Sequence, residues 1–242
     1  YSNSVKFWLN ESTYYIDDEN KKEALIRLFS DSKVAFIYGA AGTGKTTMIN
    51  HISNFYNNDR KIYLANTHPA VENLKRKVSA QNGEFYTIKK ILSDNFIDKD
   101  CDILIIDECS TVSNEDMLNI LTNINFELLV LVGDIYQIES ITFGNWFEIA
   151  KVLMEDKTKF ELTVPYRSQN ENLKILWDKV RKLDDEIVEW MSLNRYSQRL
   201  DESILISNDD DEIILCLNYD GLYGINNINR FMQNSNKNKP VD

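Results

Sequence analysis

The sequence predicts an α/β fold in which helices flank a parallel sheet. Apolar runs of strand length alternate with segments of helical periodicity along the first two thirds of the chain. These runs are apolar throughout rather than at every second residue, which is typical of strands covered by helices on both faces. With 242 residues, the chain can form one large domain, or one domain and part of another. The predicted strands span residues 34–38, 61–65, 102–106, 126–132 and 159–163.

Helices are predicted before, between and after these strands. Residues 19–29 place their apolar side chains on one helical face, so a helix precedes the first strand. Pro69 suits the N1 position of the helix after the second strand, where its missing N–H costs nothing. Ser113 is the predicted N-cap of a later helix, with Asp116 at the third position. Helices in these connections are what parallel strands require.

The character of the chain changes after residue 165. Residues 170–191 are charged and helical, with an apolar stripe that indicates ordinary helix packing. A strand over residues 212–217 and a helix over residues 225–233 follow. The predicted parts are a first α/β domain over 1–165, a helical connector over 166–203 and an incomplete second α/β piece over 204–242.

Composition and charge exclude several classes of protein. The net charge of −11 argues against wholesale nucleic-acid binding through global charge. Three cysteines without C-x-x-C spacing indicate neither a zinc site nor a disulfide framework, and a reducing, cytoplasmic setting is expected. The apolar runs are too short to span a bilayer, so no membrane partner is expected.

Residues 39–46 fit the phosphate-loop pattern G-x-x-x-x-G-K-[ST]. They lie between a predicted strand and a predicted helix, the context that such a loop requires; a glycine loop that only turns the chain is the alternative. Lys45 should reach the β- and γ-phosphates, and the Thr46 hydroxyl should ligate Mg²⁺. The residues predicted to bind the nucleotide here are Gly39, Ala41, Gly42, Thr43, Gly44, Lys45, Thr46 and Thr47.

Two acids follow the third predicted strand. Asp107 and Glu108 come directly after an apolar run, at the carboxyl end of a strand, where α/β sheets bind ligands. Asp107 is predicted to hold Mg²⁺, directly or through water. Glu108 is predicted to orient and deprotonate the attacking water in phosphoryl transfer. The alternative is a pair of surface acids that merely ends a strand.

Later polar residues follow the fourth and fifth predicted strands. Gln137 follows Gly133-Asp134, and its amide can both donate and accept, as a γ-phosphate sensor requires. Arg167 is a candidate contact to the γ-phosphate, and Tyr166 is a candidate to stack on a base. Each of these signals is weak alone, because a Tyr-Arg pair more often packs on a surface.

The order of these motifs, with Thr67-His68-Pro69-Ala70 between the first two, resembles superfamily 1 helicases, and the RecD-like branch in particular. Residues 217–225 resemble the opening of that family's second motor domain. The resemblance extends from about residue 18 to 240. It implies a RecA-like fold, the first motor domain of a DNA helicase or translocase, with ATP and Mg²⁺ as cofactors.

The resemblance also implies residue roles. Tyr166 would stack on adenine, and Thr67 and His68 fall on the motif that contacts single-stranded nucleic acid. Trp146 lies where the family can place a stacking aromatic, with a position in the core as the alternative. The residues implied in catalysis are Lys45, Glu108, Gln137 and Arg167.

Two departures from the family pattern matter. Asn20 stands nearest to the position of the adenine-reading glutamine, and the late motifs, including a second arginine, are absent. The resemblance therefore implies half of a two-part motor, with single-stranded DNA (or RNA) and a missing second motor domain as its partners. The alternative is a regulatory ATPase switch that keeps the helicase core without translocating. Exposure of Thr67, His68 and Trp146 on one face would favour the motor, and their burial the switch.

Overall fold

The computed structural model describes residues 19–29, 32–79, 81–135, 144–164, 170–197 and 214–235. The chain divides into two compact units, residues 1–181 and 182–242. The strands of the first unit are β1 (Val34–Gly39), β2 (Lys61–Ala65), β3 (Gly83–Thr87), β4 (Asp100–Ile106), β5 (Asn125–Gly133) and β6 (Lys159–Leu162). Its α-helices are α2 (Glu19–Leu28), α3 (Lys45–Phe55), α4 (His68–Lys77), α5 (Ile88–Ser93), α6 (Asn114–Asn123), α7 (Trp146–Leu153) and α8 (Glu171–Arg181), with 3-10 turns η1 (Cys109–Thr111) and η2 (Asp156–Thr158).

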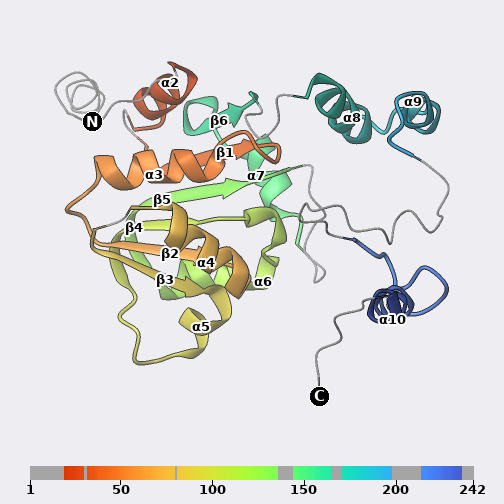
Figure 1. The fold of residues 1–242 in the computed structure, drawn as a ribbon. Coiled ribbons are helices and arrows are strands. Elements are labelled where there is room, and N and C mark those ends of the chain that lie inside the picture. Colours follow the sequence, from red (N-terminus) through yellow and green to blue (C-terminus); the bar gives the residue numbers. More distant parts are fainter. Residues whose placement is uncertain are drawn as a thin grey trace. The chain divides into compact units, whose positions relative to one another are not determined.

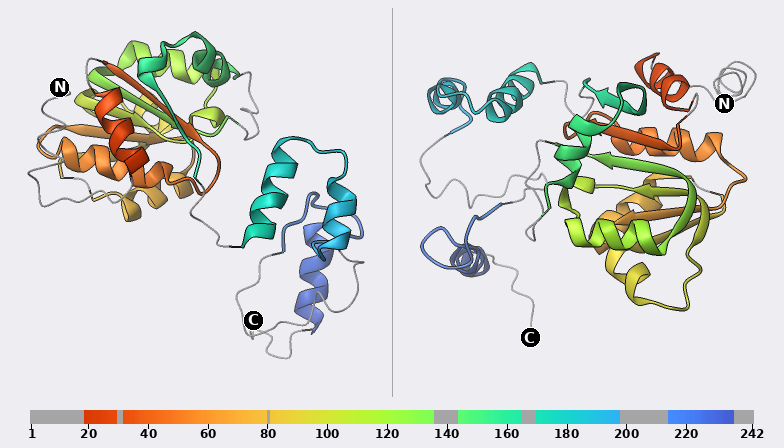
Figure 2. Two further views of the ribbon diagram at one scale, coloured as in Figure 1. Left: turned by 90° about the horizontal axis from the view of Figure 1, so that it is seen from above. Right: turned by 180° about the vertical axis from the view of Figure 1, so that it is seen from behind.

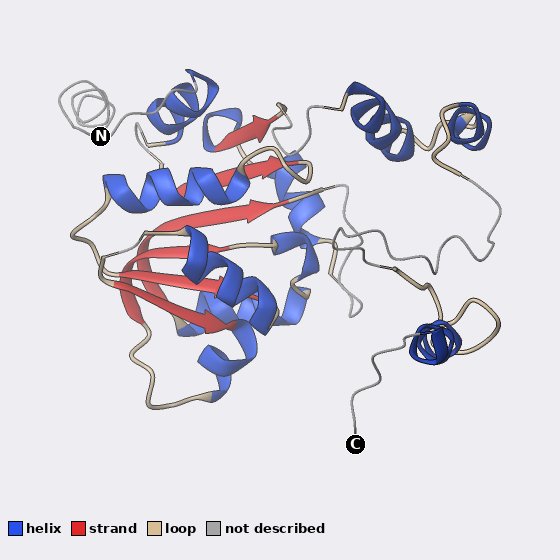
Figure 3. Cartoon of the chain, viewed as in Figure 1, coloured by secondary structure: helices blue, strands red, loops and turns tan. Residues whose placement is uncertain are grey.

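The strands form a six-stranded sheet in the order β3-β2-β4-β5-β1-β6, and every pairing is parallel (Figures 1 and 3). The five predicted strands are confirmed, and with them the α/β class. The sequence prediction missed β3. This strand lies at the edge of the sheet, and its Gly83-Glu84 start and partly exposed side chains do not give the continuous apolar run of a central strand.

Helices cover both faces of the sheet, as the views in Figure 2 show. Because neighbouring strand residues point to opposite faces, the core has two halves. In β1, Ile37 faces α2, α3 and α4, whereas Phe36 faces α5, α6 and α7. Phe36 stacks on Phe147 of α7 with 4.4 Å between ring centroids. Burial on both faces explains why the central strands read as continuous apolar runs.

Local caps start the helices where the sequence predicts them. The Ser113 hydroxyl accepts the Asp116 N–H at 3.0 Å, which confirms the predicted N-cap of α6. Thr67 caps α4 in the same way, accepting from the Ala70 N–H at 3.3 Å. These caps place the amino-terminal ends of α4 and α6 at the carboxyl edge of the sheet, where the phosphate loop lies.

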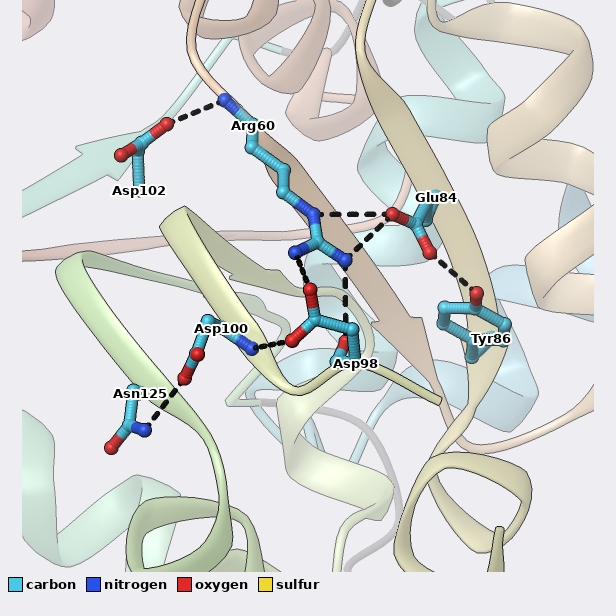
Figure 4. A network of polar contacts seen from close by, with 7 residues as sticks. All are labelled: Arg60, Glu84, Tyr86, Asp98, Asp100, Asp102 and Asn125. Atoms are coloured by element: carbon cyan, nitrogen blue, oxygen red, sulfur yellow. Dashed lines mark hydrogen bonds and ion pairs between the residues drawn. The ribbon is translucent and has the colours of Figure 1, made fainter. Parts of the chain in front are cut away.

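Arg60 ties together the amino ends of three strands, at the opposite edge of the sheet (Figure 4). Its backbone N–H donates to Asp102 of β4 at 2.7 Å, and its guanidinium donates to Glu84 of β3 at 2.9 Å and to Asp98. The two carboxylates, Asp98 first, raise the pKa of Arg60. Glu84 also accepts from the Tyr86 hydroxyl at 2.6 Å. The network fixes this edge, remote from the loop.

Beyond β6, the described residues form helices joined by loops and turns. The helix predicted over residues 170–191 is divided into α8 and α9 (Ile187–Leu193) by a turn in which Leu183 has a positive φ of 51°. The helix predicted near residue 225 is confirmed as α10 (Ile225–Ser235). Of the strand predicted over 212–217, residues 214–217 are described, and they are not in a strand.

Candidate nucleotide-binding site

The loop from β1 to α3 has a backbone that depends on glycine. Gly42 and Gly44 have φ values of 82° and 87°, a region that residues with a Cβ rarely adopt. A Cβ on Gly39 would lie 2.5 Å from the Leu162 carbonyl oxygen, so this glycine allows β1 and β6 to approach. The Thr43 hydroxyl donates back to a loop carbonyl at 2.8 Å. The loop is thereby wrapped over the amino-terminal end of α3.

A cavity of about 600 Å³ lies beside this loop, within the size range of small-molecule sites. It is bounded by the phosphate loop, α3, α4 and the carboxyl ends of β4 and β5. Two predicted nucleotide residues, Gly39 and Thr43, shape the loop without lining the cavity. The lining residues are Ala41, Gly42, Gly44, Lys45, Thr46, Thr47, Asn50, Asn73, Lys77, Asp107, Glu108, Gly133 and Asp134.

Lys45 is held at the centre of the loop. Its ammonium donates to the Gly39 carbonyl at 2.6 Å and to the Ala40 carbonyl at 2.9 Å. It also lies 3.8 Å from an Asp134 carboxylate oxygen. Asp134 is buried at the end of β5, and sequence reasoning did not place it among the site residues. Its position directly after a buried strand, like that of Asp107, was the available signal.

Asp107 is a buried carboxyl at the end of β4. Burial raises the pKa of Asp107 to about 6, with the nearby Glu108 carboxylate adding to the rise. The Glu108 N–H, which donates to Asp107 at 2.9 Å, and the charges of Lys45 and Lys77 oppose the rise. A carboxylate in this position is stabilised by a cation. The Asp107 carboxylate and the Thr46 hydroxyl at one cavity supply the oxygen donors that Mg²⁺ takes, so the residues present fit this ion.

Glu108 lines the same cavity from a strained backbone position. Its φ of 55° and ψ of 39° lie in the left-handed region, which a non-glycine residue adopts at a cost. The backbone N–H and the hydroxyl of Thr111 donate to the Glu108 carbonyl at 2.9 and 2.8 Å. The η1 turn therefore holds the backbone of Glu108. Strain of this kind is concentrated at functional sites.

The predicted nucleic-acid residues do not lie together on one element. Thr67 and His68 are exposed at the start of α4. Trp146 is half-buried at the start of α7 and packs against the half of the core on the other face of the sheet. Its indole N–H donates to the Val112 carbonyl at 2.8 Å, and its ring meets Phe147 edge-on at 5.5 Å. The indole is thus engaged within the fold.

Three predicted site residues, Gln137, Tyr166 and Arg167, lie outside the described residues, and their roles stay predictions.

The cavity also includes residues that sequence reasoning missed. Asn73 and Lys77 line it from α4, four residues apart and so on one helical face. Asn50 lines it from α3. The Cε of the buried Lys21 of α2 lies 3.1 Å from where a Cβ on Gly44 would stand, against the loop. Of these residues, only Asn73 and Lys77 could have been linked from the sequence, by their helical spacing.

Together, the parallel sheet, the loop with Lys45 and the acids ending β4 define a P-loop NTPase domain of the RecA-like class. A family model described as an AAA domain matches residues 18–200. The chain belongs to this family.

Comparison with solved structures agrees with this assignment of fold. Pif1 helicase from Bacteroides in complex with ADP-AlF3 and ssDNA superposes with a TM-score of 0.61 at 18% identity, over 95% of this chain and 59% of that one. Bacteroides sp. Pif1 in complex with ADP-AlF4 gives 0.57 at 19%, over 84% and 54%. This chain thus spans little more than half the length of those helicases. The predicted RecA-like fold is confirmed.

No curated protein matches this chain. Among the helices that the structure describes, none combines the length and the hydropathy needed to cross a membrane.

Proposed function

We propose that this chain is the ATP-binding motor domain of a superfamily 1 helicase or translocase of the RecD-like branch. It would hydrolyse ATP with Mg²⁺, coupled to single-stranded DNA. The observation that carries the proposal is the single cavity that joins Lys45 of the phosphate loop to Asp107 and Glu108 at the end of β4. The Bacteroides Pif1 structures, which hold ADP-AlF3 or ADP-AlF4 and, in one case, ssDNA, support the same combination of ligands.

The residues of the cavity divide the proposed work. Lys45 and the N–H groups at the start of α3 bind the phosphates. Thr46 and Asp107 hold Mg²⁺, which would neutralise charge on the phosphate oxygens. Glu108 orients the attacking water and accepts its proton at a carboxylate oxygen. Asp134 keeps the Lys45 ammonium in the loop at 3.8 Å.

The remaining roles belong to the same proposal. Gln137 would sense the γ-phosphate, Arg167 would stabilise charge in the transition state, and Tyr166 would stack on adenine. The exposed pair Thr67 and His68 would contact the strand, with RNA as the alternative track. The partner would be the second motor domain, of which residues 204–242 would be the opening piece. The proposed setting is the cytoplasm, in keeping with the free thiols among the described residues.

We propose domain boundaries after residues 165 and 203, and both of these residues lie outside the described ranges. The division into compact units falls at another place, between residues 181 and 182.

A regulatory ATPase switch is the second candidate, and one observation favours it. The indole N–H of Trp146 donates to the Val112 carbonyl, so a hydrogen bond within the domain already fixes the orientation of this ring. The exposure of Thr67 and His68 favours the motor instead. Both candidates use the same ATP site and differ in their response to nucleic acid.

The deciding experiment measures ATP turnover by the natural full-length protein with and without single-stranded DNA. Lys45→Ala is the blank, and Lys33→Ala, an exposed lysine away from the cavity, is the matched control. Stimulation by the strand that Lys45→Ala abolishes and Lys33→Ala retains would support the motor. Turnover that ignores DNA and RNA strands would support the switch, and an active Lys45→Ala protein would refute the assignment of the site.

A further inference from the structure

The η1 turn, which follows Asp107 and Glu108, is tied to the rest of the domain from two directions. From the end of β2, the Asn66 side-chain amide donates to the Thr111 carbonyl at 3.0 Å. From the start of α7, the Trp146 indole N–H donates to the Val112 carbonyl at 2.8 Å. Two consecutive carbonyls, that of Thr111 at the end of the turn and that of the following Val112, are thus held by side chains 45 and 34 residues away.

The same turn determines the conformation of Glu108. Thr111 donates both its backbone N–H and its hydroxyl to the Glu108 carbonyl, at 2.9 and 2.8 Å. The left-handed backbone of Glu108, with φ of 55°, is thereby held by Thr111, whose own carbonyl accepts from Asn66. A shift of the Asn66 amide therefore acts on Glu108 through one intervening residue.

Asn66 is also the direct neighbour of the surface proposed to contact the strand. It precedes Thr67, the N-cap of α4, and Thr67 and His68 are both exposed. Because Asn66 and Thr67 share a peptide bond, any movement of the start of α4 moves the backbone from which the Asn66 side chain reaches Thr111. Asn66 thus connects a solvent-exposed surface to the residue proposed as the general base.

We propose that Asn66 and Trp146 are positioning residues that set the conformation of Glu108, and that Asn66 communicates occupancy of the Thr67–His68 surface to Glu108. The inference rests on the proposed function, strand-coupled ATP hydrolysis. Trp146 binds the Val112 carbonyl on the face of the sheet that lies opposite α4. The route uses only residues 66, 108, 111, 112 and 146, and it is separate from the role proposed for Gln137.

A purely structural role makes a different prediction. If the two hydrogen bonds only satisfied backbone carbonyls, their loss would lower stability without changing the response to a strand. The discriminating quantity for Asn66 is therefore the ratio of strand-stimulated to basal kcat, and for Trp146 it is kcat itself. Both are measured together with the KM for ATP and with strand affinity by fluorescence anisotropy. A general base displaced by about 1 Å can cost about a hundredfold in rate.

The test compares Asn66→Ala, Trp146→Phe and wild type in the natural full-length protein. Asn123→Ala is the matched control, because it removes an asparagine-to-carbonyl hydrogen bond of 2.8 Å on α6, away from the cavity. Asn66→Ala should lower the stimulation ratio about tenfold, with the KM for ATP and strand affinity within about twofold. Trp146→Phe, which keeps an aromatic ring beside Phe147, should lower basal and stimulated kcat together. Asn123→Ala should match wild type.

The outcomes separate the inference from the proposed function. Wild type that ignores the strand would overturn both. A stimulated wild type with an equally stimulated Asn66→Ala variant would overturn the inference alone. If thermal unfolding shows that Asn66→Ala does not fold, Trp146→Phe decides, and kcat values equal to those of wild type would then overturn the positioning role.

Discussion

Replacing Asp107 with asparagine should stabilise the nucleotide-free protein at neutral pH while abolishing the proposed ATP hydrolysis. Asparagine has nearly the same shape, and its carbonyl oxygen can still accept the Glu108 N–H that Asp107 accepts at 2.9 Å. What changes is the buried negative charge, which burial disfavours. The same charge is needed to hold Mg²⁺, so stability and the proposed activity oppose each other at this residue.

The magnitude follows from the pKa of Asp107. Burial raises it from 3.8 to about 6, and one pKa unit corresponds to about 1.4 kcal/mol. Ionised Asp107 therefore lowers the free energy of unfolding by about 3 kcal/mol above pH 6. The sign follows from protonation: the folded state binds the proton more tightly, so this penalty is absent below pH 3.8 and grows as the pH rises to 6. Asparagine removes it.

The assay is urea unfolding of Asp107→Asn and wild type at pH 7 and pH 4, without nucleotide or Mg²⁺. A gain of about 3 kcal/mol at pH 7 should shrink to about 0.5 kcal/mol at pH 4, and the melting temperature at pH 7 should rise by about 6–12 °C. Glu127→Gln, at an exposed position on β5, is the control and should change stability by less than about 0.5 kcal/mol. A gain that is absent at pH 7, or that is equal at both pH values, would refute the reasoning.

Three further predictions concern the core and can be checked by urea unfolding. Gly133→Ala should cost about 1–3 kcal/mol, because the new Cβ would lie 2.6 Å from the Phe147 ring; an unchanged midpoint would contradict this. Tyr63→Phe should cost about 1 kcal/mol by removing the buried 2.6 Å hydrogen bond to Ser53, and a stabilised variant would oppose it. Lys61→Met should cost about 2–3 kcal/mol, since its buried ammonium donates to three backbone carbonyls near the end of α3 at 2.5–3.2 Å. A neutral result there would show that water satisfies those carbonyls.

Much of the fold was predictable because its signals are local. The run before Gly39, the loop and the helix after it are contiguous, so spacing alone located the phosphate site. Asp107 and Glu108 were predictable for the same reason, as they directly end a buried strand. The edge strand β3 was missed because its Gly83-Glu84 start and its partly exposed side chains give no continuous apolar run.

The sequence could not specify which residues from other elements complete the cavity. Asn73 and Lys77 reach it from α4, and this depends on how α4 packs on the sheet. Trp146 shows the same limit: its position suggested stacking on a base or burial in the core, and the structure makes it a half-buried donor to the Val112 carbonyl. Such contacts depend on strand order and register, which local periodicity does not contain.

By itself, the sequence determined the chemistry that this chain can offer: a phosphate loop with Lys45, a carboxylate pair at a strand end, and the alternation of strands and helices that builds a parallel sheet. Only the tertiary structure decided how these groups are held. It buried Asp107 and raised its pKa, placed Asp134 near Lys45, and linked Asn66 to the turn behind Glu108. The physical reason is that residue type and periodicity act within one element, whereas burial and hydrogen-bond geometry arise only when distant elements pack together.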